Sequence, residues 1–180
     1  VRIAIIGSGP SGLSAAAHAA ELNISHVLLE AEEHPSHTIF RYQKGKHVMA
    51  EPGILPLRSP MSFVAGKREA VLGAWDQELQ KYKVNIQYNQ EVTAISGQKG
   101  AFEIKTKAGG TVKAEHVVLC IGLQGNIRKL GVAGEDLPRV QYQLDDPGEY
   151  NGETIMVVGA GDAGIENALA LAENNRVILI

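Results

Sequence analysis

Short apolar runs that lead into glycine-rich turns mark both ends of the chain. At the amino end, the run 3–6 (IAII) precedes a glycine turn, an alanine-rich stretch at 11–22 and a second apolar run at 27–29. Strands that are apolar at nearly every position are typical of central parallel strands covered on both faces. The pattern therefore predicts a parallel β-strand, a right-handed crossover helix and a second parallel strand.

The middle of the chain has a different periodicity. Residues 31–66 are rich in loop-forming residues, with prolines at positions 35, 52, 56 and 60. Residues 67–82 then repeat apolar side chains at helical spacing. This predicts an amphipathic helix that packs against the core through Val71, Trp75, Leu79 and Tyr82.

Three β-like stretches follow at 91–96, 101–106 and 111–114, with glycines in the turns between them. Their spacing predicts a small antiparallel β meander. The chain then returns to an apolar run at 117–121, which we expect to be a buried strand of the parallel sheet. After an acidic connector that contains proline and glycine, a second strand–turn–helix–strand pattern occupies residues 155–180.

These patterns predict an α/β fold with three parts. We expect residues 1–123 to form a Rossmann-like domain with a parallel sheet and an inserted antiparallel meander, residues 124–153 a connector, and residues 154–180 the first βαβ unit of a second Rossmann-like domain. In this last unit, the runs 155–158 and 177–180 should pair as parallel strands. So small a unit leaves strand edges exposed. We therefore expect it to pack on the first domain, to pair with a neighbouring chain in a homodimer, or to be continued by further sequence.

The first turn, GSGPSG at 7–12, has the spacing of a dinucleotide-binding turn. Gly7 permits a tight exit from the strand, Gly9 lets the backbone approach a pyrophosphate, and Gly12 lets the helix lie close to the sheet. Amide groups of the first helical turn would face the phosphates. Glu30 closes the second strand, where its carboxylate could accept hydrogen bonds from both ribose hydroxyls. Together these features predict a dinucleotide site.

The second turn repeats this arrangement with Gly159, Gly161 and Gly164, after the strand 155–158 and before a helix at 163–174. It predicts a second nucleotide site. The acid or arginine that would meet the 2′ position of the ribose would come after Ile180, so both NADH and NADPH stay open as ligands.

The charge pattern excludes two classes of partner. The chain has 17 basic and 20 acidic residues and a net charge of −3, which is too balanced for nucleic acid or an anionic membrane as the main partner. A locally basic stretch at 41–68 is either a solvated face or a surface that attracts phosphates or an acidic protein. No apolar run approaches the roughly 20 residues of a membrane span.

Few other residues suggest chemistry. Cys120 is the single cysteine, so no intrachain disulfide can form. Because the sequence shows no signal peptide, the cytoplasm is the expected compartment. His34 and His37 lie beside two glutamates but lack further ligands at diagnostic spacing, so no metal site is predicted. No serine, histidine and acid set stands out for nucleophilic catalysis.

Over nearly its whole length the chain resembles the amino-terminal part of the two-dinucleotide-binding flavoproteins, a group that includes thioredoxin reductases and flavin-containing monooxygenases. The resemblance rests on the two glycine turns and on two further stretches. VVLCIG at 117–122 stands in the place of a strand that ends in an Ala-Thr-Gly-like turn near the flavin, and GVAGE at 131–135 in the place of a Pro-Gly-Glu stretch. The resemblance implies that the first turn binds FAD and the second NAD(P)H.

The cofactor-binding residues that the resemblance implies fall into two sets. For FAD they are Gly7, Ser8, Gly9, Pro10, Ser11, Gly12, Glu30, Ala31, Val92, Cys120, Ile121 and Gly122. For NAD(P)H they are Gly159, Gly161, Asp162, Ala163, Gly164 and Glu166. Within the first set, Cys120 and Ile121 depart from the usual Ala-Thr.

The redox motifs of the known branches are missing. Thioredoxin reductases carry a Cys-x-x-Cys before the second turn, where this chain reads VQYQL at 140–144. Flavin-containing monooxygenases carry a His-Ser pair there, where this chain has Gln141 and Tyr142. Enzymes that resemble bacillithiol-disulfide reductases place a cysteine in the first turn, where this chain has Ser11.

The resemblance therefore implies an FAD-dependent NAD(P)H oxidoreductase. Hydride would pass from the nicotinamide to the flavin and on to a small-molecule or protein electron acceptor without an internal dithiol. Two alternatives stay open: a flavin-dependent monooxygenase, and a non-enzymatic flavin-binding module for redox sensing or electron transfer.

Overall fold

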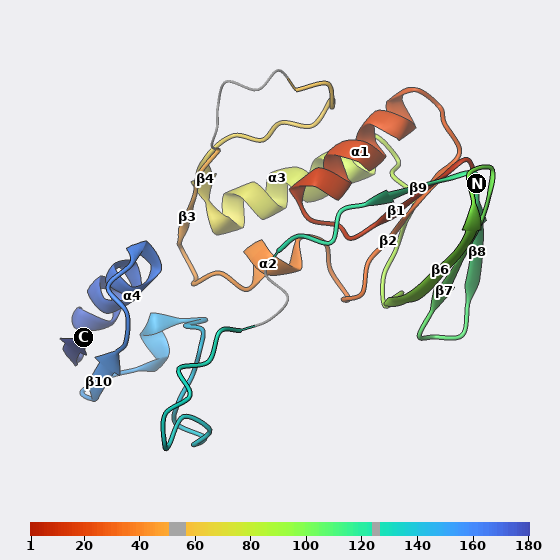
Figure 1. Cartoon of the computed structure of the whole chain (residues 1–180). Helices are drawn as coiled ribbons and strands as arrows, with labels where there is room; N and C mark the ends of the chain where they lie inside the picture. Colours follow the sequence, from red (N-terminus) through yellow and green to blue (C-terminus); the bar gives the residue numbers. More distant parts are fainter. Residues whose placement is uncertain (51–56, 124–126) are drawn as a thin grey trace. The chain divides into compact units, whose positions relative to one another are not determined.

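The computed structural model describes residues 1–50, 57–123 and 127–180. The chain divides into two compact units (Figure 1). Unit 1 contains Val1–Phe40 and His47–Gly125, and unit 2 contains Arg41–Lys46 and Asn126–Ile180. Parts of two predicted regions, 51–56 of the loop-rich region and 124–126 of the connector, lie outside the described residues. Within the described residues, no helix is both long enough and apolar enough to cross a membrane.

Unit 1 is built on a parallel sheet in the order β5-β2-β1-β9. Its members are β1 (Ile3–Ile6), β2 (His26–Leu29), β5 (Ile86–Gln87) and β9 (His116–Leu119). Ile3 of β1 pairs with His26 of β2 on one side and with His116 of β9 on the other. The helix α1 (Pro10–Glu21) makes the predicted crossover between β1 and β2 and packs along both strands (Figure 1).

The two central strands are covered on both faces, as their apolar runs predict. On one face, Ala4 and Leu29 cluster with Ile104 and Ala114, which belong to the antiparallel strands. Alternate residues of a strand point to opposite faces, so Ile5 lies on the other face; it is fully buried, as is Leu13 of α1.

The predicted meander and amphipathic helix are both confirmed. The meander consists of β6 (Val92–Gln98), β7 (Ala101–Thr106) and β8 (Thr111–Ala114), paired antiparallel in that order. The helix α3 (Arg68–Lys81) buries Val71, Trp75 and Leu79. Tyr82 lies at its end, half-buried, and donates a hydrogen bond to the carbonyl oxygen of Pro60 at 3.3 Å.

Short elements occupy part of the region expected to be loop. They are α2 (His37–Phe40) and the strands β3 (His47–Val48) and β4 (Gly66–Lys67), which pair antiparallel. The sequence analysis also missed β5, a two-residue strand at the edge of the parallel sheet beside β2.

The expectation that the run 117–121 is a buried strand is wrong in two respects. The strand β9 ends at Leu119, and the side chains of Leu119 and Ile121 are 62% and 72% exposed. The physical reason is the place of β9 at the edge of the sheet, because in the described part of the chain no strand pairs with its outer side.

Unit 2 contains the second strand–helix–strand pattern. The strands β10 (Thr154–Val157) and β11 (Arg176–Leu179) pair in parallel, and the helix α4 (Asp162–Ala172) joins them, so the predicted pairing is confirmed within one or two residues at each end. The stretch before β10 is mostly irregular, with one 3₁₀ turn, η1 (Pro147–Glu149). Apolar side chains of this unit stay exposed, among them Met156 at 58% and Leu169 at 69%.

Candidate functional site

The glycines of the first turn meet different surroundings. Gly7 has a φ of +94°, and a Cβ there would lie 2.5 Å from the carbonyl oxygen of Cys120. A Cβ on Gly12 would lie 1.9 Å from the carbonyl oxygen of Gly7. Around Gly9, in contrast, a Cβ would meet nothing within 4 Å. Two glycines are therefore required by close packing of strand, turn and helix, whereas the third opens onto free space.

The helix α1 begins at this glycine, beside the free space. Gly9 is its N-cap residue and Pro10 its first residue, and no side chain caps the helix. The first amide groups of an uncapped helix are unsatisfied donors, and together with the helix dipole they favour an anion. The turn can thus hold a pyrophosphate.

Glu30 lies buried beside the turn, with 7% of its surface exposed. Its Oε2 accepts a hydrogen bond from the backbone N–H of Ser8 at 2.8 Å and another from the Ser8 hydroxyl. Its Oε1 accepts the backbone N–H of Glu32 at 3.0 Å. The backbone of Glu30 is held by β5, since its N–H donates to the carbonyl oxygen of Gln87 at 2.9 Å. The acid predicted at the end of β2 is therefore fixed against the glycine turn.

A cavity of about 330 Å³ brings two of the predicted FAD segments together. Gly9, Pro10 and Ser11 line it from the turn, and the segment after β9 lines it through Leu119, Cys120, Ile121, Gly122 and Leu123. The other six predicted FAD residues do not line this cavity. Four of them, Gly7, Ser8, Gly12 and Glu30, form the turn and its buried acid. Ala31 is exposed on the loop after Glu30, and Val92 packs against the hydrophobic cluster under the sheet.

The thiol of Cys120 is half-buried beside the turn, where burial raises its pKa. Because the thiolate is the reactive form, we expect Cys120 to react with iodoacetamide more slowly in the folded protein than in urea at the same neutral pH. Mass spectrometry of timed samples measures both rates. Equal rates would show that the burial of this thiol is lost in solution.

The second turn shares the close approach of helix and turn with the first, although a Cβ on Gly159, unlike one on Gly7, would meet nothing within 4 Å. Gly159 has a φ of +103°, and a Cβ on Gly164 would lie 1.8 Å from the carbonyl oxygen of Gly159. A Cβ on Gly161 would meet nothing within 4 Å, and Gly161 is the N-cap of α4, which again has no side-chain cap. Asp162 and Ala163, both in the predicted NAD(P)H set, form the first two positions of α4. The spacing of the glycines therefore produces two similar cradles.

Glu166, the remaining member of the predicted NAD(P)H set, forms an ion pair on α4. Its Oε2 lies 2.6 Å from Nζ of Lys46. Two residues earlier, Lys44 donates its backbone N–H to the carbonyl oxygen of Asp145 at 2.9 Å and pairs with Asp146 at 3.1 Å. The basic stretch at 41–68 is thus partly neutralised inside unit 2, and sequence reasoning gave no signal for these long-range pairs.

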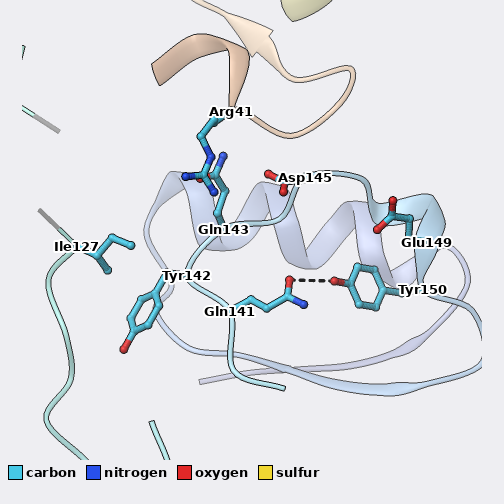
Figure 2. Close-up of a pocket in the computed structure, with 8 residues that line it drawn as sticks. All are labelled: Arg41, Ile127, Gln141, Tyr142, Gln143, Asp145, Glu149 and Tyr150. Atoms are coloured by element: carbon cyan, nitrogen blue, oxygen red, sulfur yellow. Dashed lines mark hydrogen bonds between the residues drawn. The ribbon is translucent and has the colours of Figure 1, made fainter. Parts of the chain in front are cut away.

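Unit 2 also contains a cavity of about 420 Å³ (Figure 2). Gln141 and Gln143 line it from the stretch where thioredoxin reductases carry their dithiol, and the Tyr150 hydroxyl donates to the Gln141 side chain at 2.9 Å. Its other lining residues are Arg41, Ile127, Tyr142, Asp145, Glu149 and Tyr150. None of these side chains can exchange electrons as a thiol pair does.

Tyr142 is held at this cavity by Glu135, which belongs to the stretch at 131–135. The Tyr142 hydroxyl donates to the Glu135 carboxylate, which also accepts the backbone N–H groups of Leu130 at 2.5 Å and Gly131 at 2.6 Å. The hydrogen bond raises the pKa of Tyr142 to about 12 and lowers the pKa of Glu135 below its ordinary value of 4.5.

These shifts predict how stability depends on pH. A carboxyl whose pKa is lowered on folding stabilises the protein above its unfolded pKa, and this contribution is lost as the pH falls through the folded pKa. We therefore expect the difference in free energy of unfolding between wild type and Glu135→Gln to stay constant from neutral pH to about pH 5 and to shrink below it. Urea unfolding at a series of pH values measures this difference. A difference independent of pH would contradict the contact between Glu135 and Tyr142.

His34 and His37 contact each other through Nε2 and Nδ1 at 3.2 Å, and His37 lies 4.0 Å from Glu32. Among the described residues, no group of three or more side chains is placed to hold a metal ion.

Several curated relatives match nearly the whole chain. It is 29% identical to a ferredoxin–NADP reductase from Ignicoccus hospitalis, over 98% of this chain and 54% of the relative. It is 27% identical to a thioredoxin reductase from Rickettsia conorii, over 99% of this chain and 54% of the relative. The chain thus spans about half the length of the curated relatives it matches.

The predicted Rossmann-like fold is confirmed by a solved structure. The chain is similar to the bacillithiol disulfide reductase Bdr from Staphylococcus aureus with a TM-score of 0.83, at 22% identity and over 99% of this chain and 56% of that one. The model of one protein family, pyridine nucleotide-disulphide oxidoreductase, matches residues 4–180. Since this match covers almost every residue, the chain belongs to the pyridine nucleotide-disulphide oxidoreductase family.

Proposed function

We propose that the chain forms the FAD site and the pyrophosphate-binding turn for NAD(P)H of an FAD-dependent NAD(P)H oxidoreductase. The observation that carries this proposal is the presence of two similar glycine cradles in one chain. In each cradle, the second glycine faces open space, and a Cβ on the third would lie within 2 Å of the carbonyl oxygen of the first. The family match and the relatives named as reductases support the same activity.

In this proposal the first cradle holds FAD. The backbone at Gly9 and the first amides of α1 face the pyrophosphate, Glu30 binds the ribose, and the segment Cys120–Gly122 borders the cofactor across the cavity of about 330 Å³. The open space at Gly9 fits the group, because a side chain there would fill the place of the phosphates. When bound, the flavin supplies the redox chemistry, and the protein supplies placement and electrostatics.

The second cradle binds the pyrophosphate of NAD(P)H through the backbone at Gly161 and the first amides of α4. Asp162 and Glu166 place negative charge near this turn, and Lys46 neutralises the second of them. The ion pair therefore limits repulsion between α4 and the phosphates.

For the electron acceptor, we propose a protein electron carrier. A relative over 98% of this chain is named ferredoxin–NADP reductase. The stretch 140–144 places glutamines rather than cysteines at the cavity of unit 2, and Cys120 is the single cysteine of the sequence. An electron route through a dithiol of this segment is therefore excluded, which favours transfer from the flavin to an external carrier.

Two measurements on the full-length protein test the proposal. Visible absorption of the purified protein is expected to show bound flavin. NADH or NADPH is expected to reduce it, with steady turnover only when ferredoxin or a small artificial acceptor is added. Product formation that requires oxygen would instead identify a flavin monooxygenase. Flavin that binds but is not reduced by either nucleotide would identify a non-enzymatic binding module.

A further inference from the structure

A network of three buried polar residues ties the FAD turn to the loop after β2. Ser8 and Ser36 are 0% and 1% exposed, and Glu30 is 7% exposed. Ser8 donates both its N–H and its hydroxyl to Oε2 of Glu30. Glu30 is the ribose ligand of the proposed function, whereas Ser8 and Ser36 have had no role in it so far, and Ser8 is fully covered by protein.

The hydrogen bonds leave few acceptor positions free on the Glu30 carboxylate. An ionised carboxylate has about four acceptor positions, two on each oxygen. Both positions of Oε2 are used by Ser8, and one position of Oε1 is used by the N–H of Glu32. One acceptor position, on Oε1, remains for a ligand.

Ser36 fixes Ser8 from the other side. Its N–H donates to the Ser8 carbonyl oxygen at 3.0 Å and to the Ser8 hydroxyl oxygen at 3.2 Å, and its own hydroxyl donates to the same carbonyl at 3.2 Å. Ser36 has a φ of +57°, which is unfavourable for a residue with a side chain. Three hydrogen bonds to one residue hold it there. The Ser8 hydroxyl, which accepts from Ser36, is thereby directed to donate to Glu30.

We propose that Ser8 and Ser36 are positioning residues that commit one oxygen of Glu30 to the glycine turn, so that Glu30 recognises a single ribose hydroxyl of FAD through Oε1. This inference rests on the proposed FAD site and narrows the expectation that Glu30 binds both ribose hydroxyls. Ser8 acts through Glu30 and does not touch the cofactor.

The test uses full-length protein freed of flavin and three ligands: FAD and the two analogues that lack either the 2′ or the 3′ hydroxyl of the adenosine ribose. Flavin fluorescence measures each dissociation constant. For wild type, one analogue is expected to bind about tenfold or more weakly than FAD and the other about as well as FAD. In Ser8→Ala, the ratio between the two analogues is expected to move toward one, because Oε2 regains a free acceptor position that can take the second hydroxyl.

Ser36→Ala is the second variant, which serves if Ser8→Ala does not fold. It removes the hydroxyl bond to the Ser8 carbonyl oxygen and keeps both N–H bonds, so it is expected to shift the ratio in the same direction by a smaller amount. Ser25→Ala removes an exposed hydroxyl outside the network and should leave all three constants unchanged. If both analogues bind wild type more weakly than FAD by the same factor, the assignment of a single hydroxyl to Glu30 is overturned. If Ser8→Ala lowers the affinity for all three ligands by the same factor, Ser8 is a structural residue and not a positioning residue. Failure of wild type to bind FAD at all would instead reject the proposed function.

Discussion

Gly12→Ala is expected to destabilise unit 1 by about 3 kcal/mol and to abolish FAD binding. The new Cβ would lie 1.9 Å from the carbonyl oxygen of Gly7, so α1 would have to move away from the turn. A shift of backbone atoms in a buried strand–turn–helix unit costs stability, because the neighbouring core is close-packed. Urea unfolding of the flavin-free protein measures the loss of stability, and fluorescence titration measures FAD binding.

Gly9→Ala is the matched control for this prediction. Gly9 has extended backbone angles that alanine adopts freely, and its Cβ would meet nothing within 4 Å. Its free energy of unfolding should therefore stay within about 0.5 kcal/mol of wild type, whereas FAD affinity should fall because the methyl group occupies the space of the pyrophosphate. A stable Gly9→Ala protein with unchanged FAD affinity would contradict the placement of the phosphates at this turn.

Gly164→Ala creates the corresponding clash in unit 2, at 1.8 Å from the carbonyl oxygen of Gly159. It should weaken NAD(P)H binding while FAD stays bound. Loss of FAD in this variant would show that the two cradles are not independent.

Local patterns predicted the parts of the fold whose cause is local. The two glycine turns, the helices after them and the meander each follow from a few neighbouring residues, because turn geometry and apolar periodicity act over short distances. The strand β5 gave no such signal, since it is two residues long and lies between polar residues. It forms because Asn85 donates to the carbonyl oxygen of His26 at 2.9 Å and its own N–H meets the His26 ring.

The candidate site also has features that local spacing predicts and contacts that it does not. The spacing of Gly7, Gly9 and Gly12 was sufficient to predict a cradle, and the distance to Glu30 was sufficient to predict an acid beside it. The partners of Ser8 and Glu166 were not predictable, because Ser36 and Lys46 reach them from a loop that shows no periodicity. The exposure of the run 117–121 was missed for a related reason: an apolar strand at the edge of a sheet has the same composition as one in its centre.

Glu30 hydrogen-bonds the turn and is the proposed ribose ligand, so its removal should affect both the stability of the protein and its FAD affinity. Glu30→Ala would leave three donors without their partner, the N–H and hydroxyl of Ser8 and the N–H of Glu32. At least the two Ser8 groups are buried, since Ser8 is 0% exposed. A buried donor without an acceptor costs about 1–3 kcal/mol, and no other acceptor of the turn is placed to replace the carboxylate among the contacts that the structure describes.

We therefore expect Glu30→Ala to lower the free energy of unfolding by about 3 kcal/mol and FAD affinity by tenfold or more, about 1.4 kcal/mol or above. Urea unfolding of the flavin-free protein and fluorescence titration with FAD separate the two effects. Glu33→Ala removes an exposed carboxylate three residues further on and should change neither. If the stability falls while the FAD dissociation constant stays that of wild type, Glu30 is a structural acid of the turn and not the ribose ligand, because a ligand contact cannot be lost without a change in affinity.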